Sequence, residues 1–158
     1  MELLFQELTG GLPDRHRLAV IVIRLLAATL LGAIVGLQRE RAHKPAGLRT
    51  HMLVCVGTAL VVLAGSGIGM TTDGLSRVIQ GIVTGIGFVG AGSILKLSQE
   101  HEIRGLTTAA GLFITAAIGV SAGVGAIGLA IIGTILAIIV LALEGVEEAW
   151  HKNRKNQD

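Results

Sequence analysis

Five long apolar segments constrain this chain more than any other feature of its sequence. Each approaches the ~20 residues that a helix needs to cross the hydrocarbon core of a membrane. We expect a helical hairpin at the glycine-rich 121–125, because the two segments flanking it would otherwise form one helix far too long for a bilayer. The sequence therefore predicts an all-α, polytopic membrane protein with about five transmembrane helices; four spans plus a re-entrant piece is the main alternative. The segments are 18–37, 52–69, 78–95, 106–122 and 124–143.

Composition agrees with a membrane protein. Hydrophobic residues make up 51% of the 158 residues and charged residues only 15%, which is unlike a soluble domain. The net charge of +2 is too small to indicate a nucleic-acid partner. We expect three parts: an N-terminal extracytoplasmic arm at 1–17, a transmembrane domain at 18–143 and a cytoplasmic tail at 144–158.

The basic residues of the short loops predict an orientation. Cytoplasmic loops of membrane proteins are enriched in Lys and Arg. With the N-terminus outside, the inner loops and tail carry Arg39, Arg41, Lys44, Arg49, Lys96, Arg104, Lys152, Arg154 and Lys155, whereas the outer segments carry Arg15, Arg17 and Arg77. This imbalance predicts an N-terminus outside and a C-terminus in the cytoplasm.

Glycine pairs with GxxxG spacing occur in the first segment, at Gly32 and Gly36, and in the third, at Gly81 and Gly85. This spacing lets helix backbones approach closely in lipid. We interpret both pairs as packing sites within the chain, with a dimer interface as the alternative.

The third segment also contains Gly87, Gly90 and Gly92. Each glycine disfavours a helix by up to ~1 kcal/mol relative to alanine. We therefore expect that this segment is either packed tightly between its neighbours or locally unwound. An unwound stretch would offer backbone carbonyls to a cation, as the broken helices of transporters do.

Charges inside or near the membrane are candidate functional groups, because a charge in lipid is costly unless it is paired or hydrated. Arg24, in the first segment, is expected to reach outward to water or to pair with Asp73. Asp73 and Arg77 stand four residues apart and can also pair with each other. Asp73 at the outer mouth and Glu40 at the inner mouth are the candidate Mg²⁺ ligands, since Mg²⁺ often uses only one or two carboxylates.

Basic side chains gather with Glu40 at the predicted inner face, where the fourth segment begins at 105–108. Free backbone N–H groups at a helix N-terminus favour an anion such as a phosphate or a lipid head group. The alternative is the ordinary enrichment of basic residues on the cytoplasmic side. His51 is expected to be an interfacial hydrogen-bonding residue, because no second His or Cys stands at metal spacing. The chain contains no HExxH, GxSxG or P-loop motif, and we expect that it is not an enzyme.

Three blocks of sequence resemble the membrane domain of the MgtC/SapB family, over roughly residues 18–143. They are GAIVGLQRERAHKPAGLRTHMLVCVGTAL, SRVIQGIVTGIGFVGAGSIL and GLTTAAGLFITAAIGV, and they occur in the order found in that family. Many members also carry a C-terminal ACT-like domain, which we do not expect here. The resemblance and the inner basic cluster together make the following the candidate functional residues: Arg39, Glu40, Arg49, Thr50, His51, Asp73, Arg77, Gly87, Gly90, Gly92, Arg104, Thr107 and Thr108.

The resemblance implies a physiological setting rather than a mechanism. The family is tied to growth in low Mg²⁺ and to virulence, and some members restrain the F-type ATP synthase. For this chain it implies a non-enzymatic regulator in the bacterial inner membrane, linked to Mg²⁺ homeostasis and acting through other membrane proteins. The alternative is a transporter or channel for Mg²⁺ or another cation that uses the glycine-rich third helix. We expect a small homo-oligomer, because five short helices enclose little core, and no cofactor other than Mg²⁺.

Overall fold

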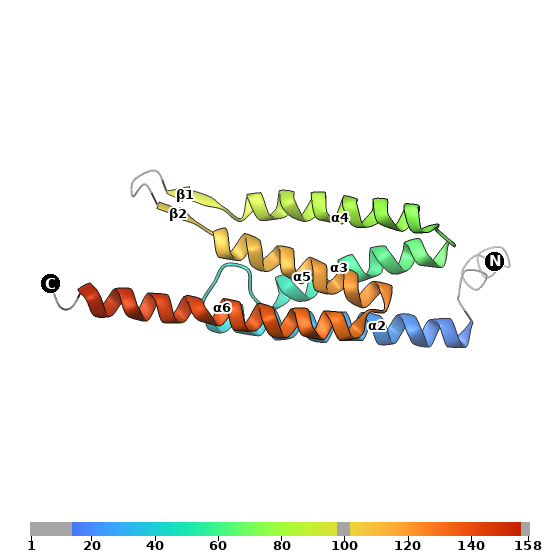
Figure 1. Cartoon of the computed structure of the whole chain (residues 1–158), viewed down its shortest axis with the longest axis horizontal. Coiled ribbons are helices and arrows are strands. Elements are labelled where there is room, and N and C mark those ends of the chain that lie inside the picture. Colours follow the sequence, from blue (N-terminus) through green and yellow to red (C-terminus); the bar gives the residue numbers. More distant parts are fainter. Residues whose placement is uncertain (1–13, 98–101, 156–158) are drawn as a thin grey trace, which may run out of the picture.

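The computed structural model of this chain describes residues 14–97 and 102–155. Within them it contains five helices and one short β-hairpin (Figure 1). Of the predicted arm at 1–17, residues 1–13 lie outside the described residues, and 15–17 form the start of the first described helix. The elements are α2 (Arg15–Arg41), α3 (Leu48–Gly67), α4 (Thr72–Gly92), β1 (Leu95–Leu97), β2 (Glu102–Arg104), α5 (Leu106–Val124) and α6 (Ile127–Lys155).

The helices confirm the predicted all-α class. Four of them, α2 to α5, are long and apolar enough to cross a membrane, and α6 contributes the shorter apolar stretch Ile127–Leu143. Helix α2 begins before the predicted segment, because the Asp14 side chain accepts a hydrogen bond of 2.8 Å from the backbone N–H of Arg17 and caps the helix. Helix α6 continues through most of the predicted tail, to Lys155.

The connection between α5 and α6 lies within the predicted hairpin region. Gly125 has a positive φ of 91°, a backbone conformation that glycine adopts without steric cost. Its backbone N–H bonds to the carbonyl of Ala122, and the N–H of Ala126 bonds to that of Ser121. These bonds complete the end of α5 and turn the chain back along it.

The segment after α4 differs from the prediction. The helix ends at Gly92, before the expected end at residue 95, and β1 pairs with β2 in an antiparallel ladder that places Leu95 opposite Arg104. Gly105 follows with a φ of 96° and lies against the backbone carbonyl of Ser93. A side chain at position 105 would collide with the end of α4, so this glycine permits the close return of the chain.

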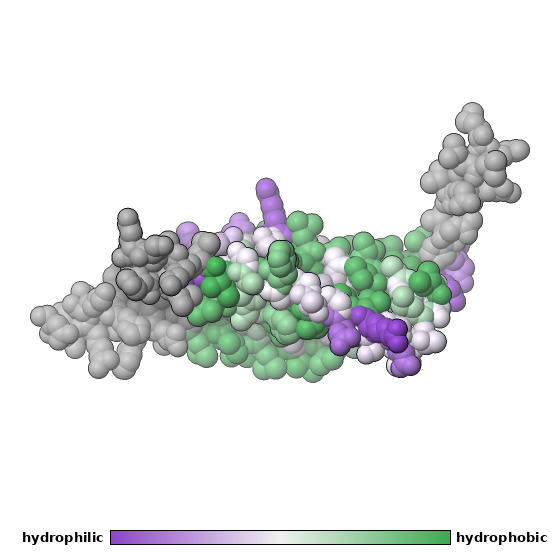
Figure 2. Space-filling view, turned by 90° about the horizontal axis from the view of Figure 1, so that it is seen from above, coloured by the Kyte–Doolittle hydropathy of each residue, from purple (hydrophilic) through white to green (hydrophobic). Residues whose placement is uncertain are grey.

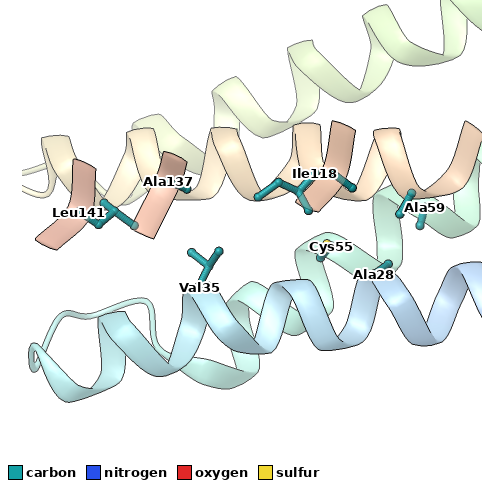
Figure 3. Close-up of a cluster of buried hydrophobic side chains, with 9 residues drawn as sticks. Ala28, Val35, Cys55, Ala59, Ile118, Ala137 and Leu141 are labelled. Carbon is teal, nitrogen blue, oxygen red and sulfur yellow. The ribbon is translucent and has the colours of Figure 1, made fainter. Parts of the chain in front are cut away.

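Small apolar side chains fill the core between α2, α3, α5 and α6. Figure 3 shows side chains of these helices pointing toward one another, from Ala28 and Val35 on α2 to Ile118 on α5. The methyl-sized residues allow the helices to lie close together, which is the usual way that membrane helices associate. The buried cluster consists of Ala28, Val35, Cys55, Ala59, Ile118, Ala122, Ala130, Ala137 and Leu141.

Glycines of α2 permit its contact with α3. A Cβ atom at Gly32 would lie 2.8 Å from the Cys55 Cβ, and one at Gly36 would lie 2.7 Å from the Leu48 Cα. Both distances are shorter than real side chains tolerate, so the predicted packing role of this GxxxG pair is confirmed. A second pair on α5, Gly119 and Gly123, approaches α3 in the same way and was not predicted.

Helix α4 lies at the edge of the bundle, where it packs mainly on α5 and α3 (Figure 1). It is one unbroken helix of 21 residues, so the predicted local break is wrong. Tight packing is also wrong for most of its glycines, because Cβ atoms at Gly81, Gly85, Gly87 and Gly92 would meet nothing within 4 Å. The GxxxG pair of α4 is therefore not packed against another helix of the described residues. The physical reason is position: an edge helix has a neighbour on one side only.

Candidate functional site

A buried polar cluster lies where α2, α3 and α5 meet. We use this name for Arg39, His51, Thr108 and Thr115, all of which are buried. Two buried hydrogen bonds link them in pairs, from α2 to α5 and from α3 to α5. Polar groups inside a membrane domain are costly unless they are satisfied, and they are the default candidates for function.

The first pair joins the last turn of α2 to the first turn of α5. Arg39 is 0% exposed, and its guanidinium donates a hydrogen bond of 3.5 Å to the hydroxyl of Thr108. The expectation that Arg39 belongs to a water-facing basic cluster is therefore wrong. Gly32, Gly36 and Arg39 follow one another at helical spacing, so the face that packs α2 onto α3 also carries the arginine inward.

The second pair joins α3 to the middle of α5. The Nδ1 atom of His51 lies 2.7 Å from the Thr115 hydroxyl, which donates its own proton to the Gly111 carbonyl at 2.8 Å. The hydroxyl oxygen must then accept the Nδ1–H, which assigns the proton of a neutral ring to Nδ1. The Nε2 atom of His51 is buried and makes no hydrogen bond to any residue that the structure describes.

His51 is therefore buried inside the bundle near the start of α3, and its contact with Thr115 confirms the expected hydrogen-bonding role. Its imidazole packs beside Gly111 of α5, where a Cβ would lie 3.6 Å from the ring, at ordinary van der Waals distance. Thr115 was not predicted as a site residue. Its signal was present in the sequence, because Thr108, Gly111 and Thr115 are spaced three and four residues apart and so share one face of α5.

Glu40 orders the start of α3. Its carboxylate accepts a hydrogen bond of 2.8 Å from the backbone N–H of Leu48, and a Cβ at Gly47 would lie 3.0 Å from the same oxygen. A carboxylate at a helix N-terminus is stabilised by the free N–H groups and by the helix dipole. Nearby, Arg49 is exposed and Thr50 is half-buried.

Asp73 and Arg77 lie at the opposite end of the bundle from Glu40, in the first turns of α4 (Figure 1). Both are exposed, and they do not form the predicted ion pair with each other. The two candidate Mg²⁺ ligands, Asp73 and Glu40, are thus too far apart to share one ion. In the described part of the chain no group of three or more His, Cys, Asp or Glu residues could hold a metal ion.

Arg24 is partly exposed and does not form the expected pair with Asp73. Its guanidinium donates a hydrogen bond of 2.9 Å to the carbonyl of Gly123 and lies against Gly125, at the turn between α5 and α6. A cation at the C-terminus of a helix is stabilised by the dipole and by the unpaired carbonyls. The charge of Arg24 is therefore paired with a backbone carbonyl group at the turn between α5 and α6.

The remaining candidates are dispersed. Gly90 contacts Ala109 of α5, where a Cβ would lie 3.5 Å away, whereas Gly87 and Gly92 face open space. Thr107 and Arg104 are exposed, next to the buried Thr108. The expected anion site comprised Arg39, Arg49, Arg104 and Thr107. Of these four residues, Arg39 is buried, whereas the other three are exposed.

Sequence comparisons show which known proteins this chain is similar to. A sequence profile of the MgtC family matches residues 25–149. Protein SrpB of Synechococcus elongatus is 43% identical over 130 residues, which cover 75% of this chain and 71% of SrpB. YhiD of Escherichia coli, a candidate magnesium transporter by its name, is 42% identical over 78% of this chain and 60% of its own length. Protein MgtC of Salmonella typhimurium is 41% identical over 79% of this chain and 52% of its own length.

The chain therefore spans little more than half the length of protein MgtC, and 60% of YhiD. No solved structure matches it.

Proposed function

Because this chain belongs to the MgtC family, we propose that this multi-pass membrane protein takes part in Mg²⁺ homeostasis as a non-enzymatic regulator. It resides in the bacterial inner membrane with its N-terminus outside and its C-terminus in the cytoplasm. It acts by contacting other membrane proteins, among which an F-type ATP synthase is one candidate. The family and the name of the relative YhiD support the link to Mg²⁺.

The observation that carries this proposal is the α4 glycine face, by which we mean Gly81, Gly85 and Gly92. A Cβ at any of these positions would meet nothing within 4 Å, although all three lie on an unbroken helix that is long and apolar enough to span the membrane. Glycine costs helix stability, and the chain itself gains no packing in return. A helix of another protein could approach this backbone closely, which is how glycine favours association in lipid.

Photo-crosslinking in native membranes tests the proposal. A photoreactive phenylalanine analogue at Phe88, which is 83% exposed beside the glycine face, should capture a specific membrane protein, more strongly in cells grown in low Mg²⁺. The matched control places the same analogue at Leu53 of α3, which is 73% exposed. Equal, unspecific labelling at both positions would contradict the proposal.

A growth assay links the contact to physiology. In a strain that lacks the protein and grows poorly in low Mg²⁺, the wild-type chain should restore growth, and the double variant Gly81→Leu/Gly85→Leu should not. The double variant and the wild type must be present in the membrane in equal amounts. Full rescue by the double variant would remove the glycine face from the function.

Transport of Mg²⁺ or another cation is the second candidate, and the buried polar cluster favours it. Ionisable side chains in the interior of a membrane domain often mark ion or proton pathways. The route first expected for this function, through carbonyls of a broken third helix, is not available, because the backbone of α4 is helical throughout. A transport path would instead have to pass His51 and Arg39.

Flux into liposomes decides between the two candidates. Purified protein would be reconstituted with an internal Mg²⁺-sensitive dye, and entry would be followed at several membrane potentials. Saturable flux that falls in His51→Ala or Asp73→Asn would establish transport. Absence of flux from correctly inserted protein would leave the regulator as the better account.

A further inference from the structure

A polar and small-residue stripe follows the length of α4 on a face that no helix of the described residues covers. We call it the α4 stripe. Its members are spaced four, three, four, three and four residues apart, so they form one seam along the helix. All six are exposed. They are Asp73, Arg77, Gln80, Thr84, Gly87 and Ala91.

The middle of this stripe is polar, although α4 is long and apolar enough to cross a membrane. Gln80 lies roughly 12 Å along the helix from Thr72 and Thr84 roughly 18 Å, at 1.5 Å per residue. The Gln80 carboxamide makes no hydrogen bond to the described residues. The Thr84 hydroxyl donates to the backbone carbonyl of Gln80 at 3.0 Å, so it can only accept from elsewhere. Uncovered amide groups in hydrocarbon are unfavourable, because lipid tails offer them no hydrogen bond.

We propose that a second copy of this chain covers the α4 stripe in a parallel, two-fold symmetric pair. Two copies inserted the same way in one membrane can be related by an axis along the membrane normal, which brings the same residues face to face. A carboxamide carries both a donor and an acceptor, so Gln80 and its symmetry mate satisfy each other. No other side chain of the stripe has this self-complementarity.

The two ends of the stripe fit the same pairing. At the end near the start of α4, Asp73 of one copy can reach Arg77 of the other, since both are exposed and neither pairs with another described residue. At the other end, Gly87 and Ala91 border an open groove of about 470 Å³ between α4 and α5, which can receive side chains of a second helix. Figure 2, seen from the α4 side, shows pale and purple atoms among the green of the apolar surface.

The α4 stripe and the α4 glycine face are different surfaces. Gly81 and Gly85 each follow a stripe residue by one position, which rotates them by about 100° around the helix. A pair formed through the stripe therefore leaves the glycine face open for another protein. The inference does not depend on the proposed role in Mg²⁺ homeostasis.

Cysteine crosslinking tests the proposed pair in purified protein, reconstituted without any other protein. The native Cys55 is buried and can stay in place. Oxidation should give disulfide-linked dimers with Thr84→Cys and Ala91→Cys, several-fold more than with Phe88→Cys on the same helix or Leu53→Cys on α3. Equal crosslinking at all four positions, or none at the stripe positions, would overturn the proposal.

Variants at the polar positions test its chemistry. Gln80→Leu should lower the association constant of the pair about tenfold, a change typical of one hydrogen bond between helices in a membrane. Gln80→Asn should retain part of the association. Unchanged association in Gln80→Leu, in protein with unaltered helix content, would refute the role of the amide.

A charge exchange tests the register of the two helices. Asp73→Arg should weaken the pair, and the double variant Asp73→Arg/Arg77→Asp should restore it, because the opposite charges then meet in exchanged positions. Failure of the double variant to recover would contradict a parallel pair in this register. In cells, Thr84→Cys crosslinked to a different protein instead of a second copy would also overturn the proposal.

Discussion

Helices α5 and α4 use the same glycine spacing in opposite ways. On α5, Cβ atoms at Gly119 and Gly123 would collide with the backbone of α3, and half of the most apolar window of the helix is buried. On α4, Cβ atoms at Gly81 and Gly85 would meet nothing, and 11% of the corresponding window is buried. The GxxxG spacing allows a second helix to approach closely. The position of the helix in the bundle determines whether that second helix belongs to the same chain.

This difference in packing divides the bundle into a part where substitutions disturb the fold and a part where they do not. Helices α2, α3 and α5 contact one another through glycine and alanine and enclose the buried polar cluster, so a change there must move backbone. Helix α4 rests on α5 and α3 by one side. Its other surfaces are available for contacts outside the chain, and substitutions on them should alter association more than folding.

The largest effect is expected from Gly36→Ala. The added Cβ would lie 2.7 Å from the Leu48 Cα and 2.9 Å from its carbonyl oxygen, and backbone cannot move aside cheaply. We expect the free energy of unfolding to fall by about 1–3 kcal/mol or more, measured by steric trapping in bicelles. Gly85→Ala is the matched control. Equal stability of Gly36→Ala and wild type would show that α2 and α3 lie farther apart.

The next effect is expected in the buried polar cluster, from Thr115→Val. The variant keeps the shape of the side chain but leaves the Nδ1–H of His51 without its acceptor. Loss of a partner by a buried donor costs about 1–3 kcal/mol. Ser121→Ala, on the same helix, serves as control, because its hydroxyl bonds only to the Ala117 carbonyl one turn away and should change stability by less than ~0.5 kcal/mol.

A double-mutant cycle tests whether the loss of stability in Thr115→Val comes from its hydrogen bond with His51. Thr115→Val and His51→Leu should be non-additive, with a coupling energy of about 0.5–2 kcal/mol for a hydrogen bond between membrane helices. Additive effects would mean that the two side chains do not interact.

The sequence predicts the helices of this protein well because each needs only an apolar run of membrane length. It also predicts, from the spacing of Gly32 and Gly36, that the first long helix packs closely within the chain, but it does not identify α3 as the partner helix. It does not predict the burial of Arg39, because the surrounding island of charge resembles a water-facing loop. The helical spacing from Gly36 to Arg39 was the available signal.

Other features depend on contacts between residues distant in the sequence. The hydrogen bond from Arg24 to Gly123 joins residues that are 99 positions apart in the sequence. No local sequence pattern indicates that Arg24 bonds to Gly123 and not to Asp73, the expected partner. The β-hairpin requires the register of two strands of three residues each, too short for a periodic signal. The glycines of α4 have the pattern of α2, so only the arrangement of all the helices reveals that they are uncovered.

A smaller effect is expected from Arg24→Met, which removes the cation from the end of α5 but keeps a long apolar side chain. The lost hydrogen bond and dipole interaction should cost about 0.3–2 kcal/mol. Amide hydrogen exchange should rise locally at 121–126, since the hairpin loses its side-chain partner. Arg17→Met is the control, because Arg17 is exposed and its backbone, not its side chain, bonds to Asp14. Unchanged exchange at the hairpin would contradict the structural role of Arg24.

The smallest effect on folding, and the one that most sharpens the comparison, is expected from Gly85→Ala. Its Cβ would enter open space, and alanine favours a helix over glycine by up to ~1 kcal/mol. The unfolding free energy of the isolated chain should therefore stay the same or rise slightly. Capture of a membrane protein at Phe88 should fall in the same variant, because the methyl group holds the partner backbone away from α4. A variant that folds better and binds worse would distinguish a contact surface from a lipid-facing helix. A variant that loses stability would instead mean that α4 is packed against the bundle as tightly as α5.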